Sequence, residues 1–176
     1  MRKENMSYKL ALSGLLIAVA TVCGTFSIPI LGARVSPIQH FINVVSAITL
    51  GPAFSVGNAF IASLIRNILG TGSILAFPGS MVGALLAGLL YKKFGSAILA
   101  VFGEVFGTGI IGAVLAYPLA TLVLGKEASV FLYVAPFLSS CIVGSILAYT
   151  LVSIPIIKET LGINNKRVLK KKKIFS

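Results

Sequence analysis

The sequence predicts an all-α membrane protein, and three observations carry that prediction. Of the 176 residues, 57% are hydrophobic and only 11% are charged, whereas a soluble domain carries about 25% charged residues. The mean hydropathy is +1.01. Long apolar runs occupy residues 10–31, 97–124 and 129–157, and a helix needs about 20 such residues to cross the hydrocarbon core. These features exclude a soluble enzyme, a disordered chain and a disulfide-stapled secreted domain.

We expect one membrane domain over residues 1–176, built from six transmembrane helices. The expected helices cover about residues 8–30, 37–50, 53–69, 79–92, 96–124 and 129–157. The stretch 37–69 is interrupted by Gly51-Pro52. Because proline ends or kinks a helix and a preceding glycine favours a turn, this stretch is either one broken span or two short ones.

The distribution of basic residues favours two spans over 37–69. With six spans and a cytoplasmic N-terminus, 12 of the 15 Lys and Arg residues lie inside, and only Arg34, Arg66 and Lys126 lie outside, as the positive-inside rule requires. A single span would put the basic tail on the wrong face. We therefore expect both termini in the cytoplasm, with the protein in the cell membrane. The tail 158–176 is expected to contact anionic lipid headgroups rather than nucleic acid.

The residues predict no enzyme, no cofactor and no metal site. The sequence Gly107-Thr108-Gly109-Ile110-Ile111-Gly112 fits a dinucleotide-binding pattern in its letters, but it lies inside an apolar run instead of after a strand. A phosphate-binding loop is absent, and the chain has one His, so no metal-spaced His or Cys cluster is visible. The two cysteines, Cys23 and Cys141, both lie in apolar stretches. We expect them to be packing residues, and the sequence leaves their redox state open.

Small residues share one face of the first expected helix. They are Ser7, Ala11, Gly14 and Ala18, at spacings of four, three and four. Small residues let helices approach closely in lipid. Internal packing is the simpler interpretation of this face, and docking to a separate membrane protein is the alternative. The pairs Gly79/Gly83 and Gly103/Gly107 predict helix crossings inside the bundle.

Polar residues inside an apolar chain are the candidates for a binding site. Glu104 lies about eight residues, roughly 12 Å, into its expected helix. It either bonds an internal partner such as Arg66 or a Tyr hydroxyl, or accepts a hydrogen bond from a bound solute. In the six-span arrangement two further clusters meet at the outer face, beside Phe77 and a glycine-containing loop over 70–80. These clusters are Arg34, Gln39, His40 and Asn43, and then Arg66 and Asn67. Tyr117 is either an aromatic-belt residue or a stacking surface for a flat ring.

Three blocks of sequence resemble the ThiW family. They are GARVSPIQHFIN at 32–43, RNILGTG at 66–72 with AFPGS at 76–80, and GEVFGTG at 103–109 with AYP at 116–118. The family comprises substrate-binding (S) components of energy-coupling factor (ECF) vitamin transporters. The resemblance extends over about residues 8–157, and the three blocks together are specific.

The resemblance implies a six-helix S-component bundle and the thiamine precursor hydroxyethylthiazole as ligand. It implies as partners a transmembrane coupling protein (EcfT-type) and two cytoplasmic ATPases, with the small-residue face of the first helix docking to the coupling protein. Such a ligand needs donors, an acceptor and an aromatic wall. We assign the donors to His40, Asn43 or Asn67, the acceptor to Glu104, and the wall to Phe77 or Tyr117. The full set of candidate binding residues also includes Arg34, Gln39, Arg66 and Thr108.

The alternative function is a stand-alone secondary transporter or channel for a small neutral solute. The sequence disfavours it because no inverted repeat is visible. Only one ionisable residue lies deep in an apolar run, where it could couple transport to an ion gradient.

Overall fold

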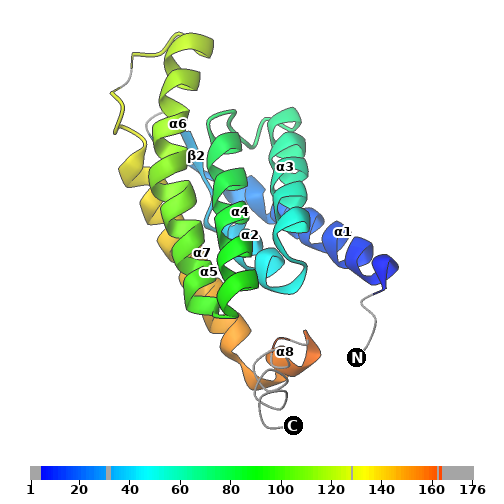
Figure 1. Cartoon of the computed structure of the whole chain (residues 1–176). Coiled ribbons are helices and arrows are strands. Elements are labelled where there is room, and N and C mark those ends of the chain that lie inside the picture. Colours follow the sequence, from blue (N-terminus) through cyan, green and yellow to red (C-terminus); the bar gives the residue numbers. More distant parts are fainter. Residues whose placement is uncertain (1–4, 31–32, 128, 162, 164–176) are drawn as a thin grey trace.

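The computed structural model describes residues 5–30, 33–127, 129–161 and 163, and these form a bundle of helices (Figure 1). The helices are α1 (Met6–Cys23), α2 (Pro37–Thr49), α3 (Pro52–Ile68), α4 (Ala76–Phe94), α5 (Ala97–Phe106), α6 (Ala113–Pro118), α7 (Val134–Ser153) and α8 (Pro155–Thr160). The π-helical segment η2 (Gly107–Gly112) joins α5 to α6, and a second one, η3 (Leu119–Val123), extends α6, so that the four segments form one long rod. A 3-10 turn, η1 (Gly24–Phe26), and two short strands, β1 (Ile28–Ile30) and β2 (Ala33–Val35), follow α1.

The stretch 37–69 forms two helices that pack on each other. Gly51 separates them with φ +88°, a conformation that side-chain-bearing residues rarely adopt. Each helix begins with a proline, Pro37 in α2 and Pro52 in α3. The first N–H of a helix has no hydrogen-bond partner within the helix, so its absence in proline has no cost. Ser55 Oγ then donates to the Asn43 carbonyl at 3.0 Å, and Asn58 Nδ2 donates to Ser46 Oγ at 2.9 Å. The hydrogen bonds from α3 back to α2 favour two helices over a single broken span.

Three of the expected helices have different boundaries in the structure. The first helix ends at Cys23 instead of 30, and the 3-10 turn η1 follows it, with Pro29 lying in the strand β1 beyond the turn. Its continuation is an antiparallel hairpin in which Ile28 pairs with Val35. The helix expected at 79–92 starts at Ala76, with Pro78 tolerated in its first turn, and ends at Phe94. The helix expected at 129–157 runs over Val134–Ser153, and Pro155 begins α8.

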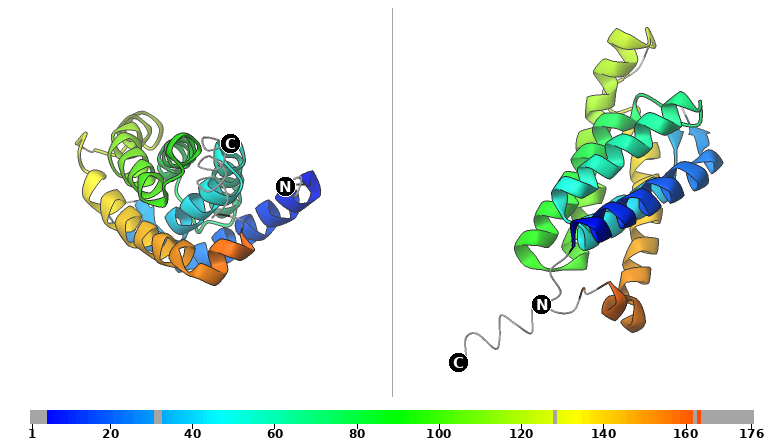
Figure 2. Two further views of the ribbon diagram at one scale, coloured as in Figure 1. Left: turned by 60° about the horizontal axis from the view of Figure 1, so that its bottom comes forward. Right: turned by 90° about the vertical axis from the view of Figure 1, so that its right-hand side faces the viewer.

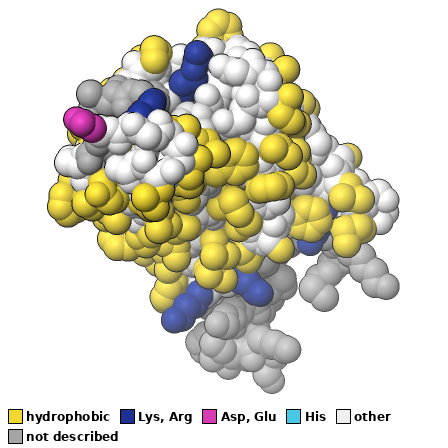
Figure 3. Space-filling model, turned by 90° about the horizontal axis from the view of Figure 1, so that it is seen from above, with side chains coloured by type: hydrophobic (Ala, Val, Ile, Leu, Met, Phe, Trp, Pro, Cys, Tyr) yellow, Lys and Arg dark blue, Asp and Glu magenta, His cyan; other side chains and the backbone are white. Residues whose placement is uncertain are grey.

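Within the described residues, three helical stretches are long and apolar enough to cross a membrane. They are Met6–Phe26, Ala97–Val123 and Val134–Ser153. Between 22% and 44% of their most apolar windows is buried inside the bundle, so most of this apolar surface faces outward. Hydrophobic side chains accordingly cover much of the surface seen in Figure 3. Such a surface is stable in lipid and not in water. The protein is therefore a helical membrane protein.

The basic side chains lie at opposite ends of the bundle. Lys9 and Lys92 line a surface hollow with the α2–α3 turn, whereas Arg34 and Arg66 line a pocket where α3 ends and α4 begins. α1 packs on α3 and α2, at the flank farthest from α5 and α6 (Figure 2). Most of the basic tail expected over 158–176, and the N-terminal Arg2 and Lys3, lie outside the described residues.

Glycines allow α4 and the α5–η2 rod to cross in close contact. A Cβ on Gly107 would lie 2.7 Å from Gly83 Cα, and a Cβ on Gly103 would lie 2.8 Å from the Ala87 nitrogen. A Cβ on Gly112 would overlap Gly79. Both predicted glycine pairs are thus confirmed as internal crossings. The crossing places Glu104 and Thr108 directly against α4.

Gly83→Ala is expected to destabilise the protein. The added Cβ would lie 2.6 Å from Glu104 Oε2 and would overlap Thr108 Oγ1, and overpacking of this kind costs about 1–3 kcal/mol. The thermal unfolding midpoint in detergent should fall. The matched control is Gly57→Ala in α3, where nothing lies within 4 Å, and its midpoint should stay the same or rise. Equal midpoints for the two variants would contradict the assigned crossing.

Candidate functional site

A pocket lies at the arginine-bearing end of the bundle. Its lining residues come from β2, α2, α3, α4, η2 and α7, and they are Arg34, Val35, Ser36, Gln39, His40, Arg66, Ala76, Ser80, Thr108 and Phe137. The cavity measures about 20 Å³, which is room for about one water molecule. Charged, amide, hydroxyl and aromatic groups therefore converge on one small space.

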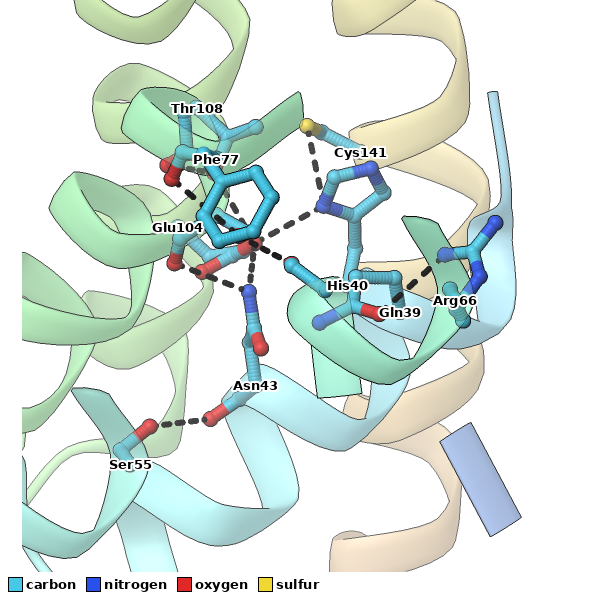
Figure 4. Close-up of polar contacts among 12 residues, drawn as sticks. Gln39, His40, Asn43, Ser55, Arg66, Phe77, Glu104, Thr108 and Cys141 are labelled. Atoms are coloured by element: carbon cyan, nitrogen blue, oxygen red, sulfur yellow. Dashed lines mark hydrogen bonds and ion pairs between the residues drawn. The ribbon is translucent and has the colours of Figure 1, made fainter. Parts of the chain in front are cut away.

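A hydrogen-bond network centred on Glu104 lies directly behind this pocket (Figure 4). Glu104 is fully buried. Its Oε1 lies 2.9 Å from His40 Nδ1, 3.0 Å from Asn43 Nδ2 and 3.1 Å from Thr108 Oγ1. The role of Nδ1 depends on the His40 tautomer, and with the hydrogen on Nδ1 the ring donates to Glu104. In a neutral ring, the other nitrogen of His40 is then an acceptor.

The same network ties the helices around the pocket together. Asn43 Nδ2 also lies 3.2 Å from the Ser80 carbonyl oxygen of α4, and Thr108 Oγ1 lies 2.9 Å from the Gly79 carbonyl oxygen. One buried carboxylate thus links α2, α4 and the α5–η2 rod. The expectation of an internal partner for Glu104 is confirmed, but the partners differ from the predicted Arg66 or Tyr hydroxyl.

Arg66 instead bonds to three neutral acceptors. It donates to Gln39 Oε1 at 3.2 Å, to the Gly24 carbonyl at 3.2 Å and to the Thr71 carbonyl at 3.3 Å. Only 4% of Arg66 is exposed. Arg34, on β2, lines the same pocket and is exposed. The two guanidinium groups make this end of the bundle electropositive, and they reach it from segments far apart in the sequence.

Several buried polar atoms at the site have no partner among the described residues. They are Gln39 Nε2, Asn43 Oδ1, Glu104 Oε2 and Arg66 Nε. A buried polar atom without a hydrogen bond costs about 1–3 kcal/mol, and such atoms are typical of functional sites. Gln39 lines the pocket, so its free N–H group is a ready donor for a molecule bound there.

The pocket brings together seven of the ten predicted binding residues. Arg34, Gln39, His40, Arg66 and Thr108 line it. Glu104 lies one hydrogen bond behind His40 and Thr108, and Asn43 lies one hydrogen bond behind Ser80, which also lines the pocket.

The other three predicted residues do not line the pocket. Asn67 donates to the Ser63 carbonyl within α3. Phe77 packs edge-on against Phe60, with ring centroids 5.8 Å apart. Tyr117 lies in α6, half-buried. The aromatic wall is Phe137 of α7, which sequence reasoning missed.

Other lining residues were also missed, for physical reasons. Val35, Ser36, Ala76 and Ser80 are ordinary small or apolar residues, and their types carry no signal. All four lie inside the sequence blocks 32–43 and 76–80 that resemble the family, and this placement was the available hint. Cys141 Sγ lies 3.5 Å from His40 Nδ1, a contact across 101 positions of sequence that no local pattern indicates.

The small-residue face of α1 points away from the bundle. Ser7, Ala11, Gly14 and Ala18 are all exposed, and nothing lies within 4 Å of a Cβ built on Gly14. The buried side of α1 carries Ser13, Leu16 and Ala20. The interpretation of this face as internal packing is therefore wrong for the described residues.

The comparisons with known proteins give one match. The family model described as thiamine-precursor transporter protein (ThiW) matches residues 10–158. This range contains the whole pocket and the Glu104 network. No curated protein and no solved structure matches the chain.

Proposed function

Because the chain belongs to the ThiW family of thiamine-precursor transporters, we propose that it is the substrate-binding component of an ECF-type importer. It captures hydroxyethylthiazole, or a close thiazole relative, outside the cell membrane. The observation that carries this proposal is the pocket at the arginine-bearing end, backed by the Glu104 network.

The pocket chemistry suits a small flat azole with one hydroxyl group. The ring of Phe137 offers a stacking surface. Gln39 Nε2 is a free donor for the ring nitrogen. The His40 nitrogen that faces away from Glu104 (Figure 4) can accept a hydrogen bond from the substrate hydroxyl, because Glu104 occupies the other nitrogen. Glu104 and Asn43 thereby act as positioning residues behind the substrate.

Substrate binding requires the pocket to open. Its volume of about 20 Å³ is far below the roughly 300–1,000 Å³ of most ligand sites. The segment between α3 and α4 contains Gly70, with φ +70°. Thr71 in this segment is held by Ser27 Oγ at 2.9 Å and by Arg66. We assign the gating movement to this segment, which is shorter than the loop expected over 70–80 because α4 starts at Ala76.

The proposed orientation places the pocket outside and both termini in the cytoplasm. Lys9 and Lys92 lie at the opposite end of the bundle from Arg34 and Arg66, which agrees with the positive-inside rule for this orientation. The six proposed spans are α1, α2, α3, α4, the α5–η3 rod and α7. α2 has 13 residues and a length of only about 20 Å, so this span is short for a bilayer.

Energy for transport comes from other proteins in this proposal. The exposed face of α1 docks to an EcfT-type coupling protein, which is driven by two cytoplasmic ATPases. The residues of this face are exposed in the described bundle, which is what a docking surface requires. Basic residues of the tail lie next to anionic lipid.

Reconstitution tests the proposal against a stand-alone transporter or channel. The purified chain in detergent should bind hydroxyethylthiazole with one site per chain, measured by calorimetry. In proteoliposomes, uptake of labelled hydroxyethylthiazole should require the coupling protein, the ATPases and ATP. Uptake by the chain alone would support the alternative function. Absence of hydroxyethylthiazole binding would contradict the assigned substrate.

A further inference from the structure

Three potential metal ligands from different helices meet at the inner end of the pocket. His40 Nδ1 of α2, Glu104 Oε1 of α5 and Cys141 Sγ of α7 all lie within 4.8 Å of one another, and all three residues are buried. In Figure 4 the Cys141 sulfur and the Glu104 carboxylate both approach the same nitrogen of His40. We propose that these residues bind one divalent transition-metal ion of the zinc class.

The separations suit such an ion. Zinc bonds of about 2.0–2.3 Å place neighbouring ligand atoms about 3–4 Å apart. His40 Nδ1 lies 2.9 Å from Glu104 Oε1 and 3.5 Å from Cys141 Sγ. Glu104 Oε1 and Cys141 Sγ lie within 4.8 Å of each other, so binding an ion requires the side chains to adjust around it.

The donor set also favours a borderline metal over Mg²⁺ or Ca²⁺. Nitrogen and sulfur ligands are preferred by Zn²⁺, Co²⁺ and Ni²⁺, whereas the harder cations prefer oxygen. A thiolate and a carboxylate together neutralise the two charges of the ion, which matters because uncompensated charge in the membrane is costly.

The two oxygens of the Glu104 carboxylate are unequally bonded. Oε1, the oxygen in the cluster, lies within 3.1 Å of three donor groups, whereas the buried Oε2, which lies against Gly83 of α4, has no hydrogen-bond donor among the described residues. If one oxygen of Glu104 binds the metal ion, the other oxygen can accept hydrogen bonds from Asn43 or Thr108, and the two oxygens then share the available partners.

The site would have an open position directed towards the pocket. Three protein ligands leave the fourth position of a tetrahedral ion free, and His40 and Thr108 line the pocket. In the metal-loaded protein an azole nitrogen is a suitable fourth ligand, in place of accepting from Gln39. His40, bound to the metal through Nδ1, then carries its ring hydrogen on the other nitrogen and donates to the substrate hydroxyl. This last step rests on the proposed function, because it takes hydroxyethylthiazole as the molecule in the pocket. The metal site itself does not depend on it.

Metal content and cobalt spectroscopy test the site on the full chain in detergent. We expect one zinc per chain after dialysis against ZnCl₂, measured by mass spectrometry. CoCl₂ added to the metal-free protein should give the near-ultraviolet thiolate-to-cobalt band and the strong visible bands of tetrahedral Co²⁺. The proposal would be overturned if the protein retained no zinc and showed no thiolate-to-cobalt band.

The two cysteines provide matched variants. Cys23 is exposed in α1, so Cys23→Ser should keep the full cobalt spectrum, which must then arise from Cys141. Cys141→Ser should abolish the thiolate band and weaken zinc binding by more than about 100-fold, since losing even an outer partner of a metal ligand costs about 10- to 100-fold. If Cys141→Ser does not fold, the Cys23→Ser spectrum still decides the question. A cobalt spectrum that survives in folded Cys141→Ser would overturn the assignment.

Hydroxyethylthiazole separates this site from the proposed function. Adding it to the Co²⁺-loaded protein should shift the visible cobalt bands if the azole nitrogen is the fourth ligand. If calorimetry still shows hydroxyethylthiazole binding but the cobalt bands do not shift, the substrate is not a ligand of the metal. Zinc binding without any hydroxyethylthiazole binding would overturn the proposed substrate and leave the metal site standing.

Discussion

Glu104→Gln is expected to weaken hydroxyethylthiazole binding about tenfold or more. The neutral amide replaces a charged acceptor, and hydrogen bonds to charged groups contribute about 1.5–3 kcal/mol against about 0.5–1.5 kcal/mol for neutral ones. A loss of about 1.4 kcal/mol is a factor of ten in affinity. The effect reaches the substrate through His40, whose Nδ1 lies 2.9 Å from Glu104 Oε1. Without the carboxylate, His40 no longer presents a fixed acceptor to the pocket.

The measurement is calorimetric affinity, together with the thermal unfolding midpoint of the same sample. Glu159→Gln is the matched control, because Glu159 is exposed in α8 and the substitution removes the same charge. It should bind the substrate normally. Glu104→Gln should still express and fold, since the amide oxygen keeps one acceptor for Asn43 or Thr108. Unchanged affinity in this variant would remove Glu104 from the binding mechanism.

The helices could be predicted from the sequence because apolar runs and prolines act locally. Gly51-Pro52 marks the division between α2 and α3 in both the sequence and the structure. The hairpin after α1 was missed because its strands have three residues each, too few to show an alternating pattern. The π-helical segments were missed as well, because a change of one residue in helical repeat leaves the composition of an apolar rod unchanged.

The site was predictable where polar residues stand out against an apolar background. His40, Asn43 and Glu104 were found because each is conspicuous in a membrane segment, and the structure joins them by direct hydrogen bonds. Phe137 and Cys141 were not found. Both belong to residue types that are common in apolar helices, and only the packing of α7 beside α2 brings them to the site.

The proposed metal ligands were also invisible to sequence reasoning. His40 and Glu104 are 64 positions apart in the sequence, and His40 and Cys141 are 101 positions apart. Metal motifs are visible in a sequence when ligands follow each other at short spacing on one element. Ligands contributed singly by three helices have no such spacing, so the sequence predicted no metal site.

Gly14→Leu is expected to abolish ATP-driven uptake while leaving substrate binding unchanged. Gly14 lies at the centre of the exposed small-residue face of α1, with nothing within 4 Å of a Cβ there, so leucine fits without disturbing the bundle. It also has a higher helix propensity than glycine. A partner helix that packs closely against small residues would be displaced by the larger side chain. Uptake in proteoliposomes with the coupling protein and ATPases should fall more than about tenfold, the change expected if at least 1.4 kcal/mol of docking energy is lost.

The control for this variant is Gly57→Leu in α3, which makes the same change at another site with open space around it. Its uptake should match that of the wild-type chain, because α3 is not assigned to the partner. Co-purification of the coupling protein should be lost in Gly14→Leu and kept in Gly57→Leu. Binding affinity for hydroxyethylthiazole should be equal in both, since Gly14 does not line the pocket. Normal uptake by Gly14→Leu would exclude this face as the docking surface. If Gly14→Leu lost both hydroxyethylthiazole binding and uptake, α1 would be shown to support the pocket itself.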